Sequence, residues 1–324
     1  MSRYLVRRLL VAIPTLVAIS LVIFTILALA PGDPLSDLAL NPAVPPEVQQ
    51  RLRESMGLED PVPVRYARWA TSLAQGDFGY SFQTRSPVSD LLVQRLPITL
   101  AVLGSAYVLA ILIAIPVGVI SSVKQYSIFD NVATTTAFIG FSLPTFFTGL
   151  LFIMLFSVKF GDWGLPTLPS VYRSTVDGEG LAGVWDRLQM MIMPITVLGL
   201  FQAAILTRYT RAAMLETIHM DYVRTARAKG LSSRVVVFRH ALRNALIPVI
   251  TIIALGIPTI FTGAVVTEQI FRIPGIGALL ITSIQNNDTP VVMAITFIFS
   301  ILVVVFNLVA DILYGVLDPR IKYE

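Results

Sequence analysis

The residues best suited to binding charged partners are crowded into one segment of the sequence. Eight Lys and Arg residues lie between positions 208 and 243, with only Glu216 and Asp221 opposing them. The cations are Arg208, Arg211, Arg224, Arg227, Lys229, Arg234, Arg239 and Arg243. Cations at this density attract anionic lipid headgroups or acidic protein surfaces. The pattern therefore predicts electrostatic binding rather than covalent catalysis.

A second group with chemical potential lies near the C-terminus. Asn307 and Asp311 are four residues apart, so they share one face of a helix. An ionisable residue in a membrane span is by default a functional candidate. Asp311 lies near the end of its apolar segment, however, which favours a structural hydrogen bond or ion pair with a neighbouring helix.

The sequence lacks the common catalytic and nucleotide-binding motifs. It contains no G-x-x-x-x-G-K-[ST], no H-E-x-x-H and no G-x-S-x-G. It has no Cys and only two His, His219 and His240, which leaves no basis for a thiolate or histidine-rich metal site. We therefore expect a passive part of a machine whose energy comes from elsewhere rather than an enzyme, with no cofactor or metal bound by this chain.

The elements that position these residues are apolar spans. Hydrophobic residues make up 55% of the 324 residues and charged residues 14%, whereas a globular chain has about 25% charged residues. A span needs about 20 mostly apolar residues. Six segments qualify, at about 9–30, 98–121, 132–157, 189–207, 245–267 and 291–315. The fourth is the weakest, because it is short and contains Gln189 and Gln202. The prediction is an all-α integral membrane protein with six transmembrane helices.

The charge distribution predicts how the chain is oriented. The first apolar run is too long for the roughly 7–15-residue core of a signal peptide, so we interpret it as a retained anchor. Six spans place both termini on one side of the membrane. With the N-terminus inside, cations exceed acids inside and acids exceed cations outside, as the positive-inside rule requires. The segment 208–243 is then cytoplasmic.

Two segments are then expected outside. The first, about 31–97, contains helical patterns near 46–57 and 64–74, and it either shields the bundle or forms a platform or lid. The second, 268–290, contains EQIFRIPGIG, whose proline and glycines require a turn. The apolar piece that follows is too short to span. We therefore predict a candidate outer-mouth element comprising Glu268, Phe271, Pro274, Gly275 and Gly277.

The basic segment predicts a helix with a defined end. Residues from Glu216 to Lys229 include helix formers and no glycine or proline, and Gly230 suits a C-terminal cap. A second helix is expected from Leu231 towards Pro248 and the fifth span. Such a short helix outside the membrane offers a surface that a partner protein can bind.

This basic segment resembles a motif of a known protein family. Arg224-Thr225-Ala226-x-x-x-Gly230 resembles the EAA loop of ABC-importer permeases. The form DYVRTARAKG is similar to that of the B-type subunit in the dipeptide/oligopeptide (and nickel) permease family. The chain departs from the general E-A-A-x-x-x-G pattern, since Arg224 takes the Glu position and Thr225 the first Ala position. The later I-x-L-P keeps only Leu242, and Pro248 follows it late.

The resemblance covers nearly the whole chain. Further matching motifs are PGDP at 31–34, Gly57-Leu58-x-x-Pro61, Gly76-Asp77-Phe78-Gly79-x-Ser81, Arg95-Leu96-Pro97-x-Thr99-Leu100, Glu268-x-x-Phe271-x-x-Pro274-Gly275-Ile276-Gly277 and Leu317-Asp318-Pro319-Arg320. The resemblance implies the type I ABC importer permease fold. It also implies an anchor with an extracytoplasmic loop over 1–97, and a five-helix core over 98–324 with a coupling loop at about 208–244.

The resemblance also implies partners. They are a homologous second permease, two cytoplasmic ATPase subunits that bind ATP and Mg, an extracytoplasmic substrate-binding protein and membrane lipid, with no nucleic acid. A coupling helix at about 217–230 would dock on one ATPase. The implied coupling residues are Asp221, Arg224, Thr225, Ala226, Arg227 and Gly230. Arg224 and Arg227 are the best candidates for pairing with ATPase acids, and the other cations serve topology and lipid attraction.

The expected function is transport of di- or oligopeptides across a bacterial or archaeal plasma membrane. The same architecture in this family also imports nickel complexes, oligosaccharides or opines. An energy-independent channel or carrier, or a membrane scaffold or receptor, stays open as a different class of protein.

Overall fold

The computed structural model describes residues 2–29, 59–173 and 180–317, together with positions 45, 47, 50, 54 and 175. Within this part of the chain, six helical segments are long and apolar enough to cross a membrane. They are Leu10–Leu29, Val88–Val123, Thr145–Asp162, Leu181–Ile218, Ser233–Gly256 and Thr289–Ile312. The six-span, all-α prediction is confirmed. The helix expected near 46–57 and the PGDP turn lie outside the described ranges.

The chain divides into two compact units. Unit 1 comprises residues 98–277 and the chain from 305, and unit 2 comprises residues 2–97 and 278–304. The proposed division at 97/98 into an anchor region and a five-helix core stays a prediction.

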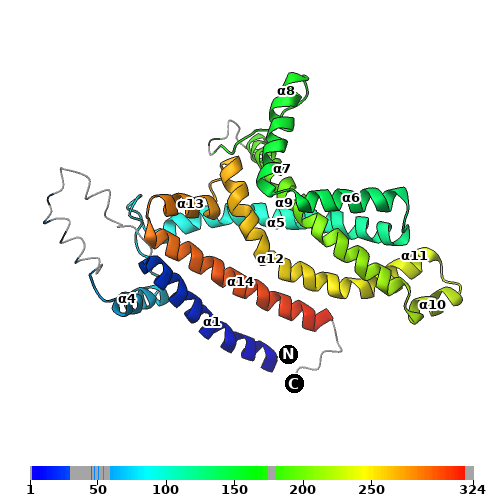
Figure 1. Cartoon of the computed structure of the whole chain (residues 1–324), viewed down its shortest axis with the longest axis horizontal. Helices are drawn as coiled ribbons and strands as arrows, with labels where there is room; N and C mark the ends of the chain where they lie inside the picture. The colour runs from blue at the N-terminus through cyan, green and yellow to red at the C-terminus, as the bar shows by residue number, and fades with distance from the viewer. Residues whose placement is uncertain are drawn as a thin grey trace. The chain divides into compact units, whose positions relative to one another are not determined.

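Unit 1 is organised around one long, buried helix. Helix α9 (Leu181–Ile218) packs against α6 (Ile128–Ser142), α7 (Thr145–Phe152) and α12 (Arg243–Phe271), as Figure 1 shows. Helix α5 (Val88–Val123) also approaches α9 closely: a Cβ on Gly199 would lie 3.1 Å from the Ala106 carbonyl oxygen. Glycine at this position therefore allows the two backbones to meet.

The prediction that the fourth span is short and weak was wrong. Helix α9 is 38 residues long, and 61% of its most apolar window is buried, the largest share of the six candidates. Gln202 is buried within the bundle. A polar residue that faces neighbouring helices is not exposed to lipid. Its presence therefore does not shorten the span.

The third span, predicted as one helix over 132–157, is instead broken. Helix α6 ends at Ser142, Leu143 is extended (φ −84°, ψ 129°), and α7 starts after Pro144. Proline disfavours the helical conformation of the residue before it. From α7 the chain continues through the π-helix η1 (Ile153–Lys159) and the short α8 (Phe160–Asp162).

The turn predicted from Pro274, Gly275 and Gly277 is present, although Gly277 itself lies in the helix that follows. Helix α12 ends at Phe271, Arg272 adopts the left-handed conformation (φ 51°), and α13 begins at Ile276 and ends at Gln285. With ten residues, α13 is too short to span on its own. The last helix, α14, covers Thr289–Leu317.

Unit 2 contains a helix pair joined by aromatic side chains. The helix predicted at 64–74 is α4 (Val62–Ala74), which packs against α1 (Ser2–Leu29). Ser20 on α1 shares a 3.0 Å hydrogen bond with the hydroxyl of Tyr66 on α4. The Phe24 ring lies 5.5 Å from that of Tyr66 and 5.6 Å from that of Trp69. Trp69 also meets the ring of Phe297 on α14 at 6.2 Å. These contacts fix α4 along α1.

Candidate functional site

The basic segment folds into a helix that begins later than predicted. Helix α9 continues to Ile218, and Met220 is extended (φ −68°, ψ 149°) before α10 (Asp221–Ala228) starts. The expectation of one helix from Glu216 to Lys229 was therefore wrong. Asp221 lies in the first turn of α10, where a carboxylate is stabilised by the positive end of the helix dipole.

The end of α10 matches the prediction. Gly230 has φ +76°, and its N–H donates to the Arg227 carbonyl at 3.0 Å. A Cβ at this position would meet no atom within 4 Å, so backbone conformation alone favours glycine here. After the turn, α11 (Ser233–Val235) and the π-helix η2 (Val236–Leu242) lead into α12. The single second helix expected after Leu231 therefore contains a π-helical turn.

One face of α10 is packed against its own chain. Val223 and Ala226 are buried in a cluster with Met214 on α9, Val236 and Ala241 on η2, Val119 on α5, and Ala245 on α12. Within the predicted coupling set, Ala226 thus holds α10 to the unit rather than facing outwards. This packing connects α10 to the helices that precede and follow it.

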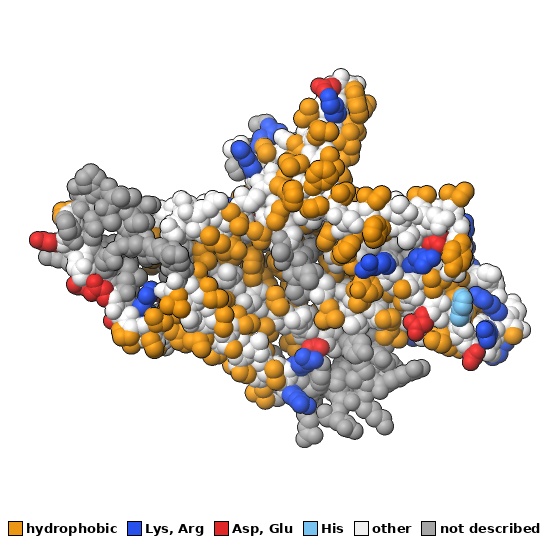
Figure 2. Space-filling model, in the orientation of Figure 1, with side chains coloured by type: hydrophobic (Ala, Val, Ile, Leu, Met, Phe, Trp, Pro, Cys, Tyr) orange, Lys and Arg blue, Asp and Glu red, His pale blue; other side chains and the backbone are white. Residues whose placement is uncertain are grey.

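The opposite face of α10 is charged and solvated. Asp221, Arg224, Thr225, Arg227 and Gly230 are exposed. Arg224 lies 3.7 Å from Asp221, with both side chains mostly exposed, and such surface pairs add little stability. Figure 2 shows Lys and Arg side chains gathered over α10 and α11, at the right of the view. These groups remain available to a partner surface.

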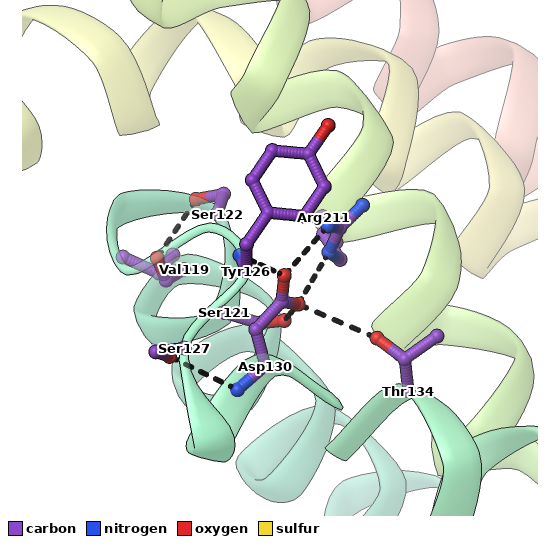
Figure 3. A network of polar contacts seen from close by, with 8 residues as sticks. All are labelled: Val119, Ser121, Ser122, Tyr126, Ser127, Asp130, Thr134 and Arg211. Carbon is purple, nitrogen blue, oxygen red and sulfur yellow. Dashed lines mark hydrogen bonds and ion pairs between the residues drawn. The ribbon is translucent and has the colours of Figure 1, made fainter. Parts of the chain in front are cut away.

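A buried ion pair holds three helices of unit 1 together near α10. Arg211 on α9 donates from Nε to Asp130 Oδ1 at 2.7 Å and from a terminal nitrogen to Oδ2 at 2.8 Å (Figure 3). Ser121 at the end of α5 also donates to Asp130, and the Tyr126 N–H donates at 2.9 Å. Thr134, one turn further along α6, donates at 3.4 Å.

The environment of Asp130 stabilises its charge. The side chain is 2% exposed, and its hydrogen bonds with Arg211, Ser121 and Tyr126 hold its pKa well below the ordinary value for a carboxyl. Sequence reasoning missed this site, because an acid between two spans is equally suited to solvent. The sequence signal for this ion pair was an acid just before one span and an Arg at the end of another span.

The predicted outer-mouth element is built around a buried carboxyl. Glu268 near the end of α12 is 1% exposed and accepts a 2.6 Å hydrogen bond from Thr99 Oγ1 on α5. The Ile276 N–H in turn donates to Thr99 Oγ1 at 2.9 Å. A Cβ on Gly275 would overlap the Glu268 carboxyl, and one on Gly277 would lie 2.6 Å from Val265 Cα.

Phe271 and Pro274, the other two residues of the predicted outer-mouth element, have different surroundings. Phe271 is buried, and its carbonyl accepts a 2.8 Å hydrogen bond from the Tyr172 N–H. Pro274 lies in the turn between α12 and α13. The structure therefore brings Glu268, Gly275 and Gly277 together, while Phe271 anchors a separate loop.

The remaining predicted pair lies on α14. Asn307 and Asp311 are one turn apart; Asn307 is exposed and Asp311 is half-buried. Among the described residues, no three His, Asp or Glu side chains are grouped so that they could hold a metal ion.

A further anchor, in unit 2, was not predicted. Asp288, between α13 and α14, is buried and accepts hydrogen bonds from Ser81 Oγ at 2.5 Å and from the Phe82 N–H at 3.0 Å. The Gln83 N–H lies 3.4 Å from the same carboxylate. The loop after Gly79 is thereby fixed to the start of α14.

Taken together, these features define a multi-pass integral membrane protein that carries an amphipathic helix packed on one side and charged on the other. Comparison with known proteins gives the family. A family described as "Binding-protein-dependent transport system inner membrane component" matches residues 114–323, and the corresponding N-terminal family matches residues 1–103. The chain belongs to this family of inner membrane components, which confirms the resemblance drawn from its motifs. It is thus a transport component that works as part of a larger ABC assembly.

Several relatives match over the full length. The chain is 45% identical to the oligopeptide transport system permease protein AppB of Bacillus subtilis, and the match covers 100% of both chains. It is 38% identical to the dipeptide permease DppB of Escherichia coli K12 and 36% identical to the glutathione permease GsiC of an Escherichia coli O1:K1 strain, again over 100% of each chain.

A solved structure supports the fold. The chain is similar to an amino acid ABC transporter crystallised with histidines, with a TM-score of 0.53 and 11% identity. The match covers 70% of this chain and 94% of the other. This likeness concerns the fold alone.

Proposed function

We propose that this chain is the B-type permease subunit of an ABC importer for di- and oligopeptides. The observation that carries the proposal is the full-length similarity, at 45% identity, to a permease named for oligopeptide transport. A second relative is named for dipeptides and a third for glutathione, itself a peptide. The chain would form half of the translocation pathway, and a homologous second permease would form the other half.

The charged face of α10 is the proposed contact with an ATPase subunit. Its exposed residues, Asp221, Arg224, Thr225 and Arg227, can pair with polar and acidic groups of a groove. The buried face, with Val223 and Ala226, keeps the helix attached to unit 1. Two cytoplasmic ATPase subunits would bind ATP and Mg and supply the energy.

The packing of α10 suggests how motion is transmitted. Because α10 shares one cluster with Met214 of α9 and with Val236 and Ala241 of η2, a displacement of α10 acts on both helices at once. The Asp130–Arg211 ion pair connects α9 in turn to α5 and α6. Interdigitated side chains transmit such displacements because they are close-packed.

The proposed orientation follows the positive-inside rule. The cation-rich segment 208–243 and both termini would face the cytoplasm of a bacterium or archaeon, with the chain in the plasma membrane. The loop fixed by Asp288 and the turn fixed by Glu268 would then lie outside. They would face the extracytoplasmic binding protein that delivers the peptide.

Uptake of a radiolabelled dipeptide and a radiolabelled pentapeptide by cells with and without the gene tests the substrate class. We expect loss of uptake in the deletion strain and rescue by the wild-type chain. Rescue should fail with Arg224→Glu/Arg227→Glu, although the variant should reach the membrane in normal amount. The matched control Arg234→Glu/Arg239→Glu changes two other exposed cations of the same segment. Unchanged peptide uptake in the deletion strain contradicts the substrate, and full rescue by the α10 variant contradicts the coupling surface.

A further inference from the structure

A groove between α6 and α9 is not explained by coupling to the ATPases. It has a volume of about 160 Å³, and its lining includes Phe138, Phe141, Ile205, Arg208 and Arg211. Most of these side chains are apolar, and both cations come from α9. A mostly apolar groove with cations along one wall fits a ligand that has an anionic head and an apolar tail.

The two arginines of the groove differ in their partners. Arg211 is engaged by the buried carboxylate of Asp130. Arg208 forms no ion pair with any acid among the described residues. Its guanidinium lies instead 5.5 Å from the ring centre of Phe141 and 5.7 Å from that of Tyr209. Arginine stacked on aromatic rings keeps its N–H donors free at the edge of the guanidinium plane. Arg208 therefore presents positive charge and donors to an incoming anion.

The position of the groove along α9 indicates where this anion comes from. Arg208 is the first cation after the apolar run 189–207, so it lies where the hydrocarbon of the bilayer gives way to headgroups. The apolar wall lies on the preceding turns of α9 and along α6, and Phe138 is 67% exposed. Figure 2 shows hydrophobic side chains over the α6 region of unit 1. The groove thus opens onto a surface suited to lipid.

We propose that this groove binds an anionic phospholipid, with the phosphate at Arg208 and an acyl chain along Phe138, Phe141 and Ile205. Basic pockets between transmembrane helices are known to suit anionic headgroups. The bound lipid would fill the space between α6 and α9 beside the Asp130–Arg211 ion pair.

Native mass spectrometry of the complex purified through a tag on this chain tests the proposal. After delipidation, the complex is titrated with phosphatidylglycerol or with phosphatidylcholine of the same acyl chains. We expect tighter binding of phosphatidylglycerol, and about a fivefold loss of that affinity in Arg208→Gln, the size expected for one surface cation. Arg208→Lys should retain most of the affinity. The matched control Arg239→Gln, an exposed cation outside the groove, should bind as the wild type does.

A second variant tests the apolar wall without changing a cation. Phe138→Ala alters an exposed side chain, so folding is preserved, and it should weaken binding of both lipids. The proposal is overturned by equal affinity for the two lipids, by wild-type affinity in Arg208→Gln, or by an equal loss in Arg239→Gln. Displacement of the lipid by millimolar inorganic phosphate identifies a free-anion site instead. In Phe138→Cys, a disulfide with a cysteine introduced into the second permease identifies a subunit interface instead. The measurement needs neither peptide nor ATP, so its failure leaves the proposed transport function intact.

Discussion

Arg211 and Asp130 are separated by 81 positions in the sequence, yet they form a bidentate ion pair inside unit 1. The pair connects α9 with the start of α6, and Ser121 attaches the end of α5 to the same carboxylate. Nearby, a Cβ on Gly118 would lie 2.7 Å from Thr210 Cβ, so α5 and α9 also touch at the backbone. Three helices thus meet at one charged contact close to α10.

Replacing Asp130 with Asn should strongly destabilise the protein. The change removes one partner of a buried ion pair, which costs about 3–5 kcal/mol, and we expect about 3 kcal/mol because Arg211 is partly solvated. Thermal loss of the monodisperse peak in size-exclusion chromatography measures the effect. The double variant Asp130→Leu/Arg211→Met should be more stable than Asp130→Asn, since no buried charge is left unpaired. A double variant less stable than the single one contradicts this interpretation.

The same pair predicts a pH dependence. The folded pKa of Asp130 is held below its unfolded value of about 3.9. The ion pair therefore contributes its full stability above about pH 5 and loses it as the pH falls through the lower, folded pKa. Midpoint temperatures of the wild type and Asp130→Asn should differ by a constant amount from pH 8 to pH 5, and converge only below about pH 4. Convergence already at pH 6 excludes Asp130 as the titrating group.

The sequence predicted local features better than contacts between helices. The turn at Gly230 follows from neighbouring residues alone, and it is present with φ +76°. Proline shows the limit of such reasoning: Pro194 lies inside continuous α9, whereas the chain breaks before Pro144. The residue type is the same, and the surrounding packing decides, since Pro194 is buried among neighbouring helices that can compensate for the missing hydrogen bond.

Pairings over long distances were beyond sequence reasoning for a physical reason. Asp130 and Asp288 each lie just outside a span. At such a position an acid is as well suited to facing solvent as to forming a buried contact. Their role depends on which donors the fold brings near, and those donors come from residues 81 and 207 positions away. Glu268 was predicted through its motif, but its contact with Thr99 was not, because that contact joins α5 to α12.

Gly230→Ala should impair α10 through the backbone alone. The left-handed conformation costs a residue with a Cβ about 1–2 kcal/mol, and no atom lies near enough to add a clash. Gly230→Asn should be milder, since Asn tolerates this conformation. Gly104→Ala serves as the matched control, because Gly104 is helical and equally uncrowded. Peptide-stimulated ATP hydrolysis by the reconstituted complex should fall in the order wild type, Asn, Ala. Equal rates in the three contradict a need for the left-handed turn.

Gly275→Ala should disturb the turn between α12 and α13 through overlap with the Glu268 carboxyl. Overpacking of this kind costs about 1–3 kcal/mol. Thr99→Val should cost a similar amount, about 1–3 kcal/mol, since it removes the hydroxyl that serves both Glu268 and the Ile276 N–H. Gly161→Ala is the control, because its Cβ would make only a 3.4 Å contact. Thermostability in detergent should separate the first two variants from the third. A wild-type midpoint for Gly275→Ala contradicts the close packing.

Asp288→Ala should release the loop that follows Gly79. The carboxylate accepts from Ser81 Oγ and from the Phe82 N–H, so its removal leaves both donors without this acceptor. Arg85 lies in this loop with φ 53° and offers a trypsin site once the loop opens. Trypsin treatment of the protein in detergent should cut Asp288→Ala at Arg85 faster than the wild type, with Ser81→Ala intermediate. The matched control is Asp77→Ala, which removes a carboxylate bonded only locally, to the Gly79 N–H at 2.8 Å, and should leave cleavage at Arg85 nearly unchanged. Equal cleavage of the wild type and Asp288→Ala shows that other contacts hold the loop.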